Sequence, residues 1–399
     1  MDNITKNENF CILPWTHLYY FTDGYVYPCP ATAGDKNMRL GATTDGVAKL
    51  WNSDTLKDMR RRMLKNERID KCFTECNGCL NSCKKYFGND LLSEVSQSIA
   101  NTKPDGEADI NFIAWNIIES NKCNLKCVYC SGNYSCLHNA DNAVMFTLPP
   151  EKLKQLYDPD NTDVKEIWFA SGEPVIQDST YITLNKLLQS NKTDIRIRFI
   201  TNLTKTEYKG QHIYDILEKF KNTIVFGSWD LDGSRGEYIR LNSDSDVIKQ
   251  TIKLINSKNI TFYLQSVMSV LNLYYYPDFH RRLHDEGLVK KDNVRYYNLH
   301  YPEHFRYSIL SKTKKDIIRN KLEAYKLWLG GITFDTYSNG ESPLVTIDKI
   351  IECMYTGKWG HWGYDETNNV GLRLQCLRYL SDDINKGRAA IHLFKDALL

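Results

Sequence analysis

Three cysteines, Cys123, Cys127 and Cys130, lie within eight residues of one another. The loop that carries them directly follows a predicted strand. Three thiolates at this spacing can hold three corners of a four-iron cluster, because iron–sulfur clusters are bound by cysteine thiolates. Three ligands for four irons leave one iron open, and catalysis at a metal requires an open coordination position. The spacing therefore favours a catalytic [4Fe–4S] cluster, and a zinc site completed by Cys136 or His138 is the alternative.

Six more cysteines form a second group near the N-terminus of the chain, which has twelve cysteines in all. They are Cys11, Cys29, Cys72, Cys76, Cys79 and Cys83. The first residues, Met1–Glu8, contain no apolar stretch of the kind found in a signal peptide, so we expect a cytoplasmic protein. In that setting, clustered cysteines indicate metal binding or catalysis rather than disulfides. Cys353 and Cys376 stand apart from both groups, and Cys353 is interpreted as a core thiol.

The composition excludes several classes of protein. The chain has 399 residues, of which 42% are hydrophobic and 25% charged, and a formal net charge of +2. This balance gives no reason to expect a nucleic acid or another polyphosphate as a partner. No apolar run reaches the roughly 18 residues of a membrane-spanning helix, so we expect no membrane partner.

From about residue 111 the chain alternates between predicted strands and predicted helices. Six short runs rich in β-branched or aromatic residues are predicted strands: 112–118, 166–170, 195–200, 223–229, 261–267 and 294–299. Helical patterns lie between them, at 151–157, 181–190, 214–221, 247–257 and 277–286. This alternation indicates βαβ units and a parallel sheet. Six strands over about 190 residues favour an α/β fold with a partial, TIM-like (β/α)6 barrel over a complete eightfold barrel.

The domain organisation follows from shifts in composition. Residues 1–90 hold half of the cysteines, and we expect a small cysteine-rich domain there. Residues 91–110 are polar and contain Thr-Lys-Pro-Asp-Gly, which is typical of a linker. We expect the barrel over 111–310 and a mostly helical region that covers the barrel over 311–399. The run Arg60-Arg61-Arg62, in a predicted helix of the first domain, is interpreted as a solvated face.

The cysteine loop and the segment after it resemble the radical S-adenosylmethionine (radical SAM) superfamily. The signature of the family is Cys-x3-Cys-x2-Cys after the first strand, usually with an aromatic residue before the last cysteine, and Tyr129 lies there. After the second strand, Ser171-Gly172-Glu173-Pro174 is similar to the family's Gly-Gly-Glu-Pro segment, although its first residue is serine. The resemblance implies that this turn holds the amino group of SAM, for which a carboxylate, exposed carbonyls and a glycine are suited.

Further polar residues match the family at the ends of the later strands. Asn202 ends the third strand. Ser-Trp-Asp-Leu-Asp-Gly, which begins at Ser228, and Arg240 further on are similar to the family's Ser-x-Asp-Gly segment with a downstream arginine. The resemblance implies that Ser228 and Asp230 lie near the ribose and Arg240 near the methionine carboxylate, which an arginine can bind with two hydrogen bonds. Gln265 ends the fifth strand, where barrel ligands bind.

The N-terminal cysteines resemble the auxiliary-cluster modules called SPASM and twitch domains. These modules open with Cys-x(9–15)-Gly-x4-Cys, which Cys11, Gly24 and Cys29 match, and the run Cys-Ile-Leu-Pro-Trp-Thr-His from Cys11 is similar to a subset that carries the module before the barrel. The seven-cysteine spacing of a full SPASM domain is not met, so the resemblance implies one auxiliary [4Fe–4S] cluster. The favoured ligands are Cys11, Cys29, Cys76 and Cys79, with Cys72 and Cys83 as substitutes. A structural zinc site built from the same thiols is the alternative.

The resemblance implies an enzyme that reductively cleaves SAM at the open iron of the cluster held by Cys123, Cys127 and Cys130. The 5′-deoxyadenosyl radical then abstracts a hydrogen atom from a substrate, which is expected to be a peptide, a sugar or a nucleoside-type metabolite. We expect the electron to come from a flavodoxin- or ferredoxin-type reductant. The outcome stays open among a crosslink, an epimerisation, a dehydrogenation and a rearrangement. An iron–sulfur electron carrier and a zinc-binding interaction protein are the alternatives.

Overall fold

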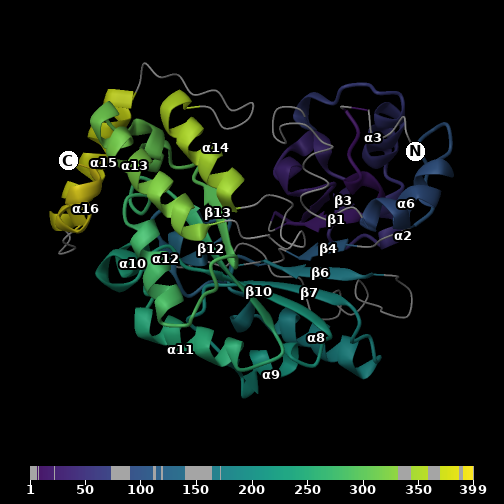
Figure 1. The fold of residues 1–399 in the computed structure, drawn as a ribbon. Coiled ribbons are helices and arrows are strands. Elements are labelled where there is room, and N and C mark those ends of the chain that lie inside the picture. Colours follow the sequence, from purple (N-terminus) through teal and green to yellow (C-terminus); the bar gives the residue numbers. More distant parts are fainter. Residues whose placement is uncertain are drawn as a thin grey trace.

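Six neighbouring parallel strands form the expected partial barrel (Figure 1). They are β4 (Ala114–Ile117), β6 (Glu166–Phe169), β7 (Arg196–Thr201), β10 (Asn222–Ser228), β12 (Thr261–Met268) and β13 (Val294–Asn298). The computed structural model describes residues 7, 9–21, 23–72, 90–110, 114–117, 120–139, 164–170, 172–330, 343–357, 369–385 and 390–398. All six strands overlap the predicted ones, and the α/β fold class is confirmed.

The strands are short runs rich in β-branched and aromatic residues, most of which are buried. Ile197, Phe199 and Val225 have no exposed surface and pack in the main core between the sheet and its helices. Those helices are α8 (Asp178–Gln189), α9 (Ile213–Leu217), α10 (Gly233–Ile239), α11 (Ser245–Asn256) and α12 (Tyr276–Asp285), and β8 (Glu207–Tyr208) with β9 (Gln211–His212) forms a separate hairpin. α9 ends at Leu217, before the predicted end at 221, because the Thr223 hydroxyl donates to the Leu217 carbonyl at 2.8 Å. The predicted helix at 151–157 lies outside the described residues.

The N-terminal part of the chain extends the barrel sheet. It adds β1 (His17–Tyr20), β2 (Tyr25–Tyr27) and β3 (Gly41–Ala42), so that the sheet has nine strands in the order β13-β12-β10-β7-β6-β4-β1-β2-β3. β1 pairs in parallel with β4, and β2 and β3 follow as antiparallel neighbours. These short strands are not among the predicted ones. The partner of β1 lies far along the chain, and no local sequence pattern indicates that the two strands pair.

The segment 91–110 is not the open linker that the sequence suggested. Together with the elements before it, this segment completes a unit that we call the N-terminal module (residues 7–110), with η1 (Leu13–Trp15), η2 (Pro30–Thr32), η3 (Lys36–Met38), α2 (Val47–Trp51), α3 (Asp54–Leu64) and α6 (Asp90–Ala100). Val95 and Ile99, four residues apart on α6, are buried in the core. The indole nitrogen of Trp51 donates to the Asp109 carbonyl at 3.0 Å. Val95, Ile99 and the hydrogen bond from Trp51 thus hold this polar segment against the elements before it.

Arg60 is another correction, because it has no exposed surface and does not lie on a solvated face. Its Nε donates to the Pro14 carbonyl at 2.9 Å, and its Nη1 donates to the side chain of Asn52 at 3.0 Å. On α3 it shares a face with the buried residues Leu56 and Met63. Burial lowers the pKa of Arg60 to about 9. The guanidinium therefore acts as an internal donor that joins α3 to the segment before β1.

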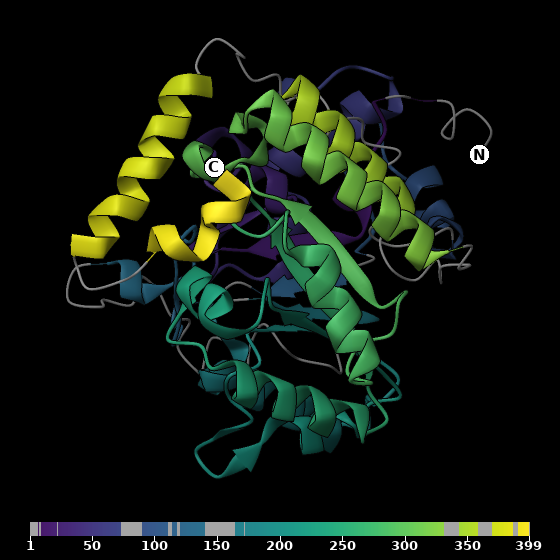
Figure 2. The ribbon, with the colours of Figure 1, turned by 60° about the vertical axis from the view of Figure 1, so that its left-hand side comes forward.

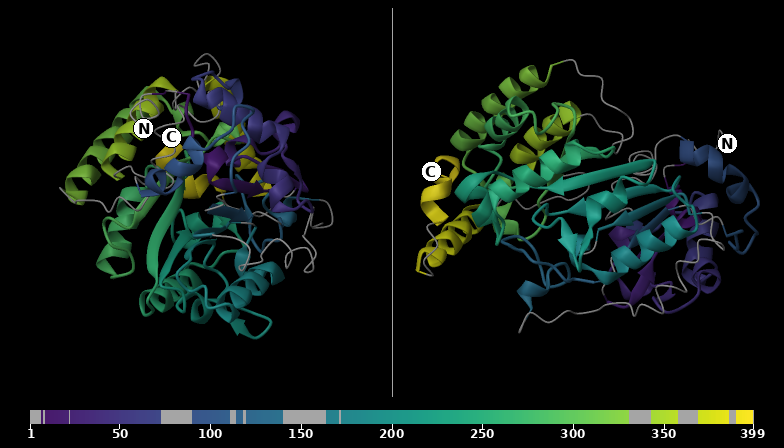
Figure 3. Two further views of the ribbon diagram at one scale, coloured as in Figure 1. Left: turned by 90° about the vertical axis from the view of Figure 1, so that its right-hand side faces the viewer. Right: turned by 90° about the horizontal axis from the view of Figure 1, so that it is seen from below.

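The C-terminal region is helical, as predicted. It contains η7 (Glu303–Phe305), η8 (Tyr307–Ile309), α13 (Lys312–Leu329), α14 (Pro343–Thr356), α15 (Asn369–Asn385) and α16 (Ala390–Leu398). Figure 2 shows α13 beside α14, and the Tyr325 hydroxyl of α13 lies 2.5 Å from Nδ1 of His280 on α12. The N-terminal module and the C-terminal helices lie at opposite ends of the molecule, with the sheet between them (Figure 3). In the described part of the chain, no helix has the length and apolar character that crossing a membrane requires.

Replacing Arg60 by alanine is expected to lower the free energy of unfolding by on the order of 3 kcal/mol, because buried carbonyl and amide oxygens lose their donor. Arg61 is the matched control on the same helix, since its side chain is 37% exposed and pairs with Asp58. Arg61→Ala should change stability by less than about 1 kcal/mol. Urea unfolding followed by circular dichroism measures both variants. Equal effects would show that the internal position of Arg60 is energetically unimportant.

Candidate functional site

A cavity of about 900 Å³ opens at the carboxyl ends of the barrel strands. Ligands of barrel enzymes bind at this end of the strands. The walls come from the cysteine loop (residues 121–136), from the carboxyl ends of β6, β7 and β10, from Arg240 and from the segment after β13. The lining residues are Cys123, Leu125, Cys127, Val128, Tyr129, Cys130, Ser131, Tyr134, Ser135, Ala170, Gly172, Ile200, Thr201, Asn202, Ser228, Arg240, His300, Tyr301 and Pro302.

The cysteine loop is closed by hydrogen bonds of its first residues. The Asn121 carbonyl accepts from the backbone N–H of Cys136 at 2.7 Å, and the Asn121 amide donates to the Gly132 carbonyl at 2.6 Å. Within the loop, β5 (Lys126–Cys127) pairs antiparallel with β11 (Arg240–Leu241). This pairing places Arg240 directly opposite Cys127. The loop is therefore fixed at both ends and in its middle while its three thiols face the cavity.

The three thiols are protonated in the absence of a metal, since burial raises the pKa of Cys123 and Cys127 to about 12 and of Cys130 to about 11. Binding of iron to such thiols releases their protons. Among the residues that the structure describes, no group of three or more His, Cys, Asp or Glu side chains is placed so that it could hold a single metal ion. The fit to a larger [4Fe–4S] cluster rests on the three thiols that share one cavity wall.

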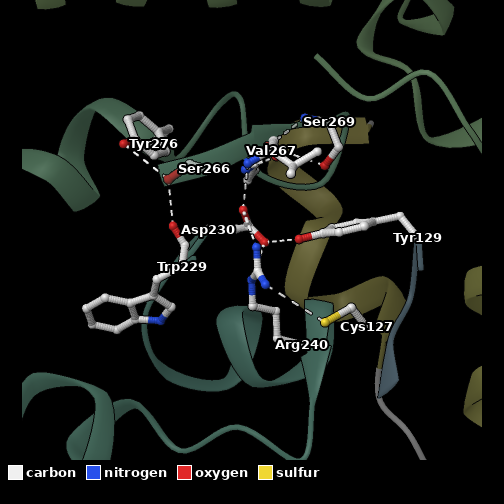
Figure 4. Close-up of polar contacts among 10 residues, drawn as sticks. Cys127, Tyr129, Trp229, Asp230, Arg240, Ser266, Val267, Ser269 and Tyr276 are labelled. Carbon is white, nitrogen blue, oxygen red and sulfur yellow. Dashed lines mark hydrogen bonds and ion pairs between the residues drawn. The ribbon is translucent and has the colours of Figure 1, made fainter. Parts of the chain in front are cut away.

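A buried ion pair between Asp230 and Arg240 stands behind the cysteine loop (Figure 4). The Nε of Arg240 donates to Oδ2 of Asp230 at 2.8 Å, and Nη2 donates to Oδ1 at 3.4 Å. The same carboxylate accepts the Tyr129 hydroxyl and, at 2.8 Å, the backbone N–H of Val267 in β12. The remaining nitrogen of Arg240, Nη1, lies 4.0 Å from the sulfur of Cys127. The Asp230 carboxylate thus positions the guanidinium of Arg240 beside Cys127, which is a predicted ligand of the cluster.

The turn after β6 is packed directly against the start of the cysteine loop. Gly172 has a φ of 46°, and a Cβ there would lie 2.3 Å from the Lys122 carbonyl oxygen, so only glycine fits. The Glu173 carboxylate, fully buried, accepts the Asn202 backbone N–H at 2.7 Å and the Thr201 hydroxyl at 2.8 Å. Burial raises the pKa of Glu173 to about 7. Both oxygens are thus engaged in bracing the turn against the end of β7.

The structure brings most of the predicted site residues into one place, although not all of them. Cys123, Cys127, Cys130, Tyr129, Gly172, Asn202, Ser228 and Arg240 line the cavity. Glu173, Asp230 and Gln265 do not line it, and Ser171 lies outside the described residues. The Asn202 amide donates to the Asn124 side chain at 2.9 Å and lies 3.9 Å from the sulfur of Cys123.

Sequence reasoning missed several residues that support the site. Thr201, which holds Glu173, and Asn121, which closes the cysteine loop, carry no signal of their own in one sequence. His300 and Tyr301 follow β13 and also line the cavity. A polar and aromatic run directly after the last barrel strand was the available signal for these two residues, because carboxyl ends of barrel strands meet at one face.

Only some of the predicted ligands of the auxiliary cluster lie among the described residues. Cys11, immediately before η1, and Cys29, just after β2, are both buried, and so is Cys72. Cys76, Cys79 and Cys83 lie outside the described residues. The ring of Phe21, at the end of β1, lies 6.0 Å from the ring of Tyr134, which lines the cavity. The N-terminal module therefore touches the wall of the candidate site.

The family comparison agrees with this geometry. Residues 117–278 match the radical SAM superfamily, a range that includes the cysteine loop and most of the barrel. The barrel region of the chain is therefore similar to radical SAM proteins. Residues 11–80 match the iron–sulfur cluster-binding SPASM domain. The radical SAM match implies a [4Fe–4S] cluster and SAM as cofactors, and the SPASM match implies auxiliary iron–sulfur binding in the N-terminal module.

Solved structures of similar proteins are distant from this chain. Native anSMEcpe with bound AdoMet is 16% identical over 56% of this chain and 63% of that one, with a TM-score of 0.43. SuiB of Streptococcus suis bound to S-adenosylmethionine is 17% identical over 70% of this chain and 60% of that one, with a TM-score of 0.42. The chain thus spans less than two thirds of both proteins. No curated protein matches it.

Asp230→Asn is expected to lower the free energy of unfolding by about 3 kcal/mol or more, because the variant leaves the buried charge of Arg240 without its counterion. Asp232→Asn is the control two residues away, since the Asp232 side chain is 21% exposed and pairs with the exposed Arg282. Its loss should stay below about 1 kcal/mol. Urea unfolding of the cluster-free full-length chain measures both. A smaller loss for Asp230→Asn than for Asp232→Asn would contradict the importance of the ion pair.

Proposed function

We propose that this chain is an enzyme that reductively cleaves SAM and abstracts a hydrogen atom from a peptide, a sugar or a nucleoside-type metabolite. The observation that carries the proposal is the meeting of three cysteine thiols in one cavity at the carboxyl ends of barrel strands. Cys123, Cys127 and Cys130 are the proposed ligands of the [4Fe–4S] cluster that the superfamily uses. When bound, the cluster and SAM supply a 5′-deoxyadenosyl radical, which can remove an unactivated hydrogen atom.

Arg240 has two roles in this proposal. Its Nη1, 4.0 Å from the sulfur of Cys127, keeps a positive charge beside a proposed thiolate and so stabilises the ionised form. Because Nε and Nη2 are held by Asp230, a contact with the methionine carboxylate of SAM uses Nη1. Asp230 itself does not line the cavity, so it acts through Arg240 and Tyr129 rather than on the ribose.

The SAM site that we propose surrounds the same cavity. Tyr129, Gly172, Asn202 and Ser228 are its lining members, Ser171 and Gln265 are retained from the sequence, and Glu173 braces the turn from behind. Leu125, Val128 and Ile200 give this wall apolar surface. Their surface excludes water from the space in which a substrate hydrogen must meet the radical, while the fixed loop and strand ends hold the reactants in position.

The N-terminal module is proposed to hold one auxiliary [4Fe–4S] cluster. Its proposed ligands are Cys11, Cys29, Cys76 and Cys79, with Cys72 and Cys83 as substitutes. The burial of Cys11 and Cys29 and the contact of Phe21 with Tyr134 support an electron relay, or a structural staple, next to the cavity. The proposed electron donor is a flavodoxin- or ferredoxin-type protein. We keep the division into residues 1–90, 111–310 and 311–399 as a proposal, with 91–110 joined to the first domain.

Replacing Cys123, Cys127 and Cys130 together by alanine is expected to remove about four irons and to abolish deoxyadenosine formation, because the cluster loses all three of its proposed protein ligands. Cys136→Ala is the matched control, since Cys136 is a buried thiol of the same loop that does not line the cavity. Iron and sulfide analysis measures the cluster content, and chromatography after incubation with SAM and dithionite measures deoxyadenosine. Deoxyadenosine from the triple variant would refute the proposal, and zinc in place of iron would favour the interaction-protein alternative.

Replacing Cys11 and Cys29 together by alanine is expected to remove about four irons while deoxyadenosine formation without substrate continues, because the barrel cluster has its own ligands. Metal-ligand free energy contributes to the folding of small sites, so residues 1–90 should also become sensitive to protease. Cys353→Ala, a buried cysteine of α14, is the control for thiol removal in general. Full iron content in the double variant would exclude Cys11 and Cys29 as ligands.

A further inference from the structure

Two exposed tyrosines line the cavity of the candidate site. Of the large apolar and aromatic side chains that line it in the described part of the chain, only Tyr134 and Tyr301 are exposed, by 44% and 61%. The residues proposed for SAM are less accessible, since Tyr129 is half-buried and Asn202 is 6% exposed. A side chain that both lines a cavity and faces solvent lies where the cavity opens. A molecule that enters the cavity therefore passes these two rings.

The two rings differ in what they contact. The ring of Tyr134 lies edge-on against that of Phe21 in the N-terminal module, with the ring centres 6.0 Å apart. Among the described residues, Tyr301 has no such aromatic neighbour, and the central guanidinium carbon of Arg306 lies 5.3 Å from the centre of its ring. Tyr134 is thus partly used in holding the module, whereas most of the Tyr301 ring is open to a ligand.

The segment that carries Tyr301 is held in place by hydrogen bonds on both sides of the ring. The Nε of Arg306, which is 5% exposed, donates to the His300 carbonyl at 2.7 Å. The backbone N–H of Leu299 donates to the carbonyl of Met268, the last residue of β12, at 3.1 Å. A ring on a segment that is already ordered loses little conformational freedom when a ligand binds, so little of the contact free energy is lost.

The charges around this ring disfavour a charged ligand group. The Arg306 guanidinium, which pairs with Glu303 at 3.0 Å, already lies within the distance at which the ring of Tyr301 attracts a cation. Among the described residues that line the cavity, Arg240 is the only Lys, Arg, Asp or Glu, and Asp230 holds two of its nitrogens. An ionised ligand group at the opening would lose hydration without gaining a counterion. The surroundings of Tyr301 therefore favour an uncharged group.

We propose that Tyr301 binds an uncharged aromatic ring of the substrate by stacking at the opening of the cavity. The inference rests on the proposed function and deepens it by naming a group that the substrate carries. Aromatic rings prefer offset-stacked or edge-on partners, and a flat partner covers more of an exposed ring than a branched aliphatic group does. The four lining residues of the proposed SAM site lie in the cysteine loop or at the ends of β6, β7 and β10, whereas Tyr301 follows β13, which β12 separates from β10. The position of Tyr301 therefore suits substrate rather than SAM.

Thermal unfolding of the full-length, cluster-containing protein, with SAM in excess and no reductant, tests the proposal. Three uncharged probes are compared: N-acetyl-L-phenylalaninamide, its aliphatic counterpart N-acetyl-L-leucinamide, and the nucleoside inosine. At least one aromatic probe should raise the melting temperature with a half-saturating concentration about fivefold or more below that of the leucine amide. The stronger of the two aromatic probes assigns the ring to an amino-acid side chain or to a nucleobase. No response to either aromatic probe, or an equal response to the leucine amide, would overturn the proposal.

Variants of Tyr301 show whether its ring makes the contact. In Tyr301→Leu the half-saturating concentration of the aromatic probe should rise about fivefold or more, whereas Tyr301→Phe should retain the response, because stacking requires the ring and not the hydroxyl. Tyr297→Leu is the matched control, because Tyr297 is a 37% exposed tyrosine of β13 that does not line the cavity. An unchanged response in Tyr301→Leu, or an equal loss in Tyr297→Leu, would contradict the proposal. Strong destabilisation of Tyr301→Leu without any probe would show that the ring serves the fold, and the proposal would be wrong.

SAM binding provides the remaining discrimination. A Tyr301→Leu variant that keeps its response to the aromatic probe but binds SAM about tenfold more weakly, a loss of about 1.4 kcal/mol, would assign the ring to SAM and refute the inference. A natural protein that binds an aromatic probe through Tyr301 but forms no deoxyadenosine from SAM would refute the proposed function while the ring-binding site stands. The two proposals therefore fail by different observations.

Discussion

The carboxylate of Asp230 is the group on which the geometry of the site depends. It follows β10, binds the guanidinium of Arg240 at the start of β11, accepts the Tyr129 hydroxyl from the cysteine loop and accepts a backbone N–H from β12. Removing charged groups from water costs several kcal/mol per ion, so the pair persists only because each partner satisfies the other. The ion pair fixes one arrangement of the site, because a displacement of the cysteine loop would separate a buried charge from its counterion.

Two buried arginines of the barrel, Arg240 and Arg295, have different surroundings. Arg240 is held by two hydrogen bonds to a carboxylate of the same chain, which fixes its orientation. Arg295 rests on aromatic rings and keeps two nitrogens without acceptors. A buried charge that is paired inside the protein holds its neighbours in place, whereas Arg295 loses hydration that its contacts with aromatic rings replace only in part.

Local patterns made the barrel predictable from the sequence. The six strands are short runs rich in β-branched or aromatic residues, and the three cysteines lie within one loop, so both could be recognised without knowledge of distant contacts. The rest depended on tertiary partners. Asp230 and Arg240 were each predicted to touch SAM, but residue types alone do not reveal that the two side chains bind each other. Arg60 stands in a run of three arginines, and only the packing of α3 shows which of them faces inward.

The order of the strands has a consequence for how the protein is made. From β1 through β4, β6, β7, β10 and β12 to β13, every strand of the large sheet lies beside the strand that preceded it in that series. A nascent chain therefore never has to insert a strand between two that are already paired. The β1–β2 hairpin can form early on the ribosome, and β4 can then pair with β1. Each later strand can pair with the strand before it as it leaves the ribosome. Vectorial synthesis and sheet growth run in the same direction in this molecule.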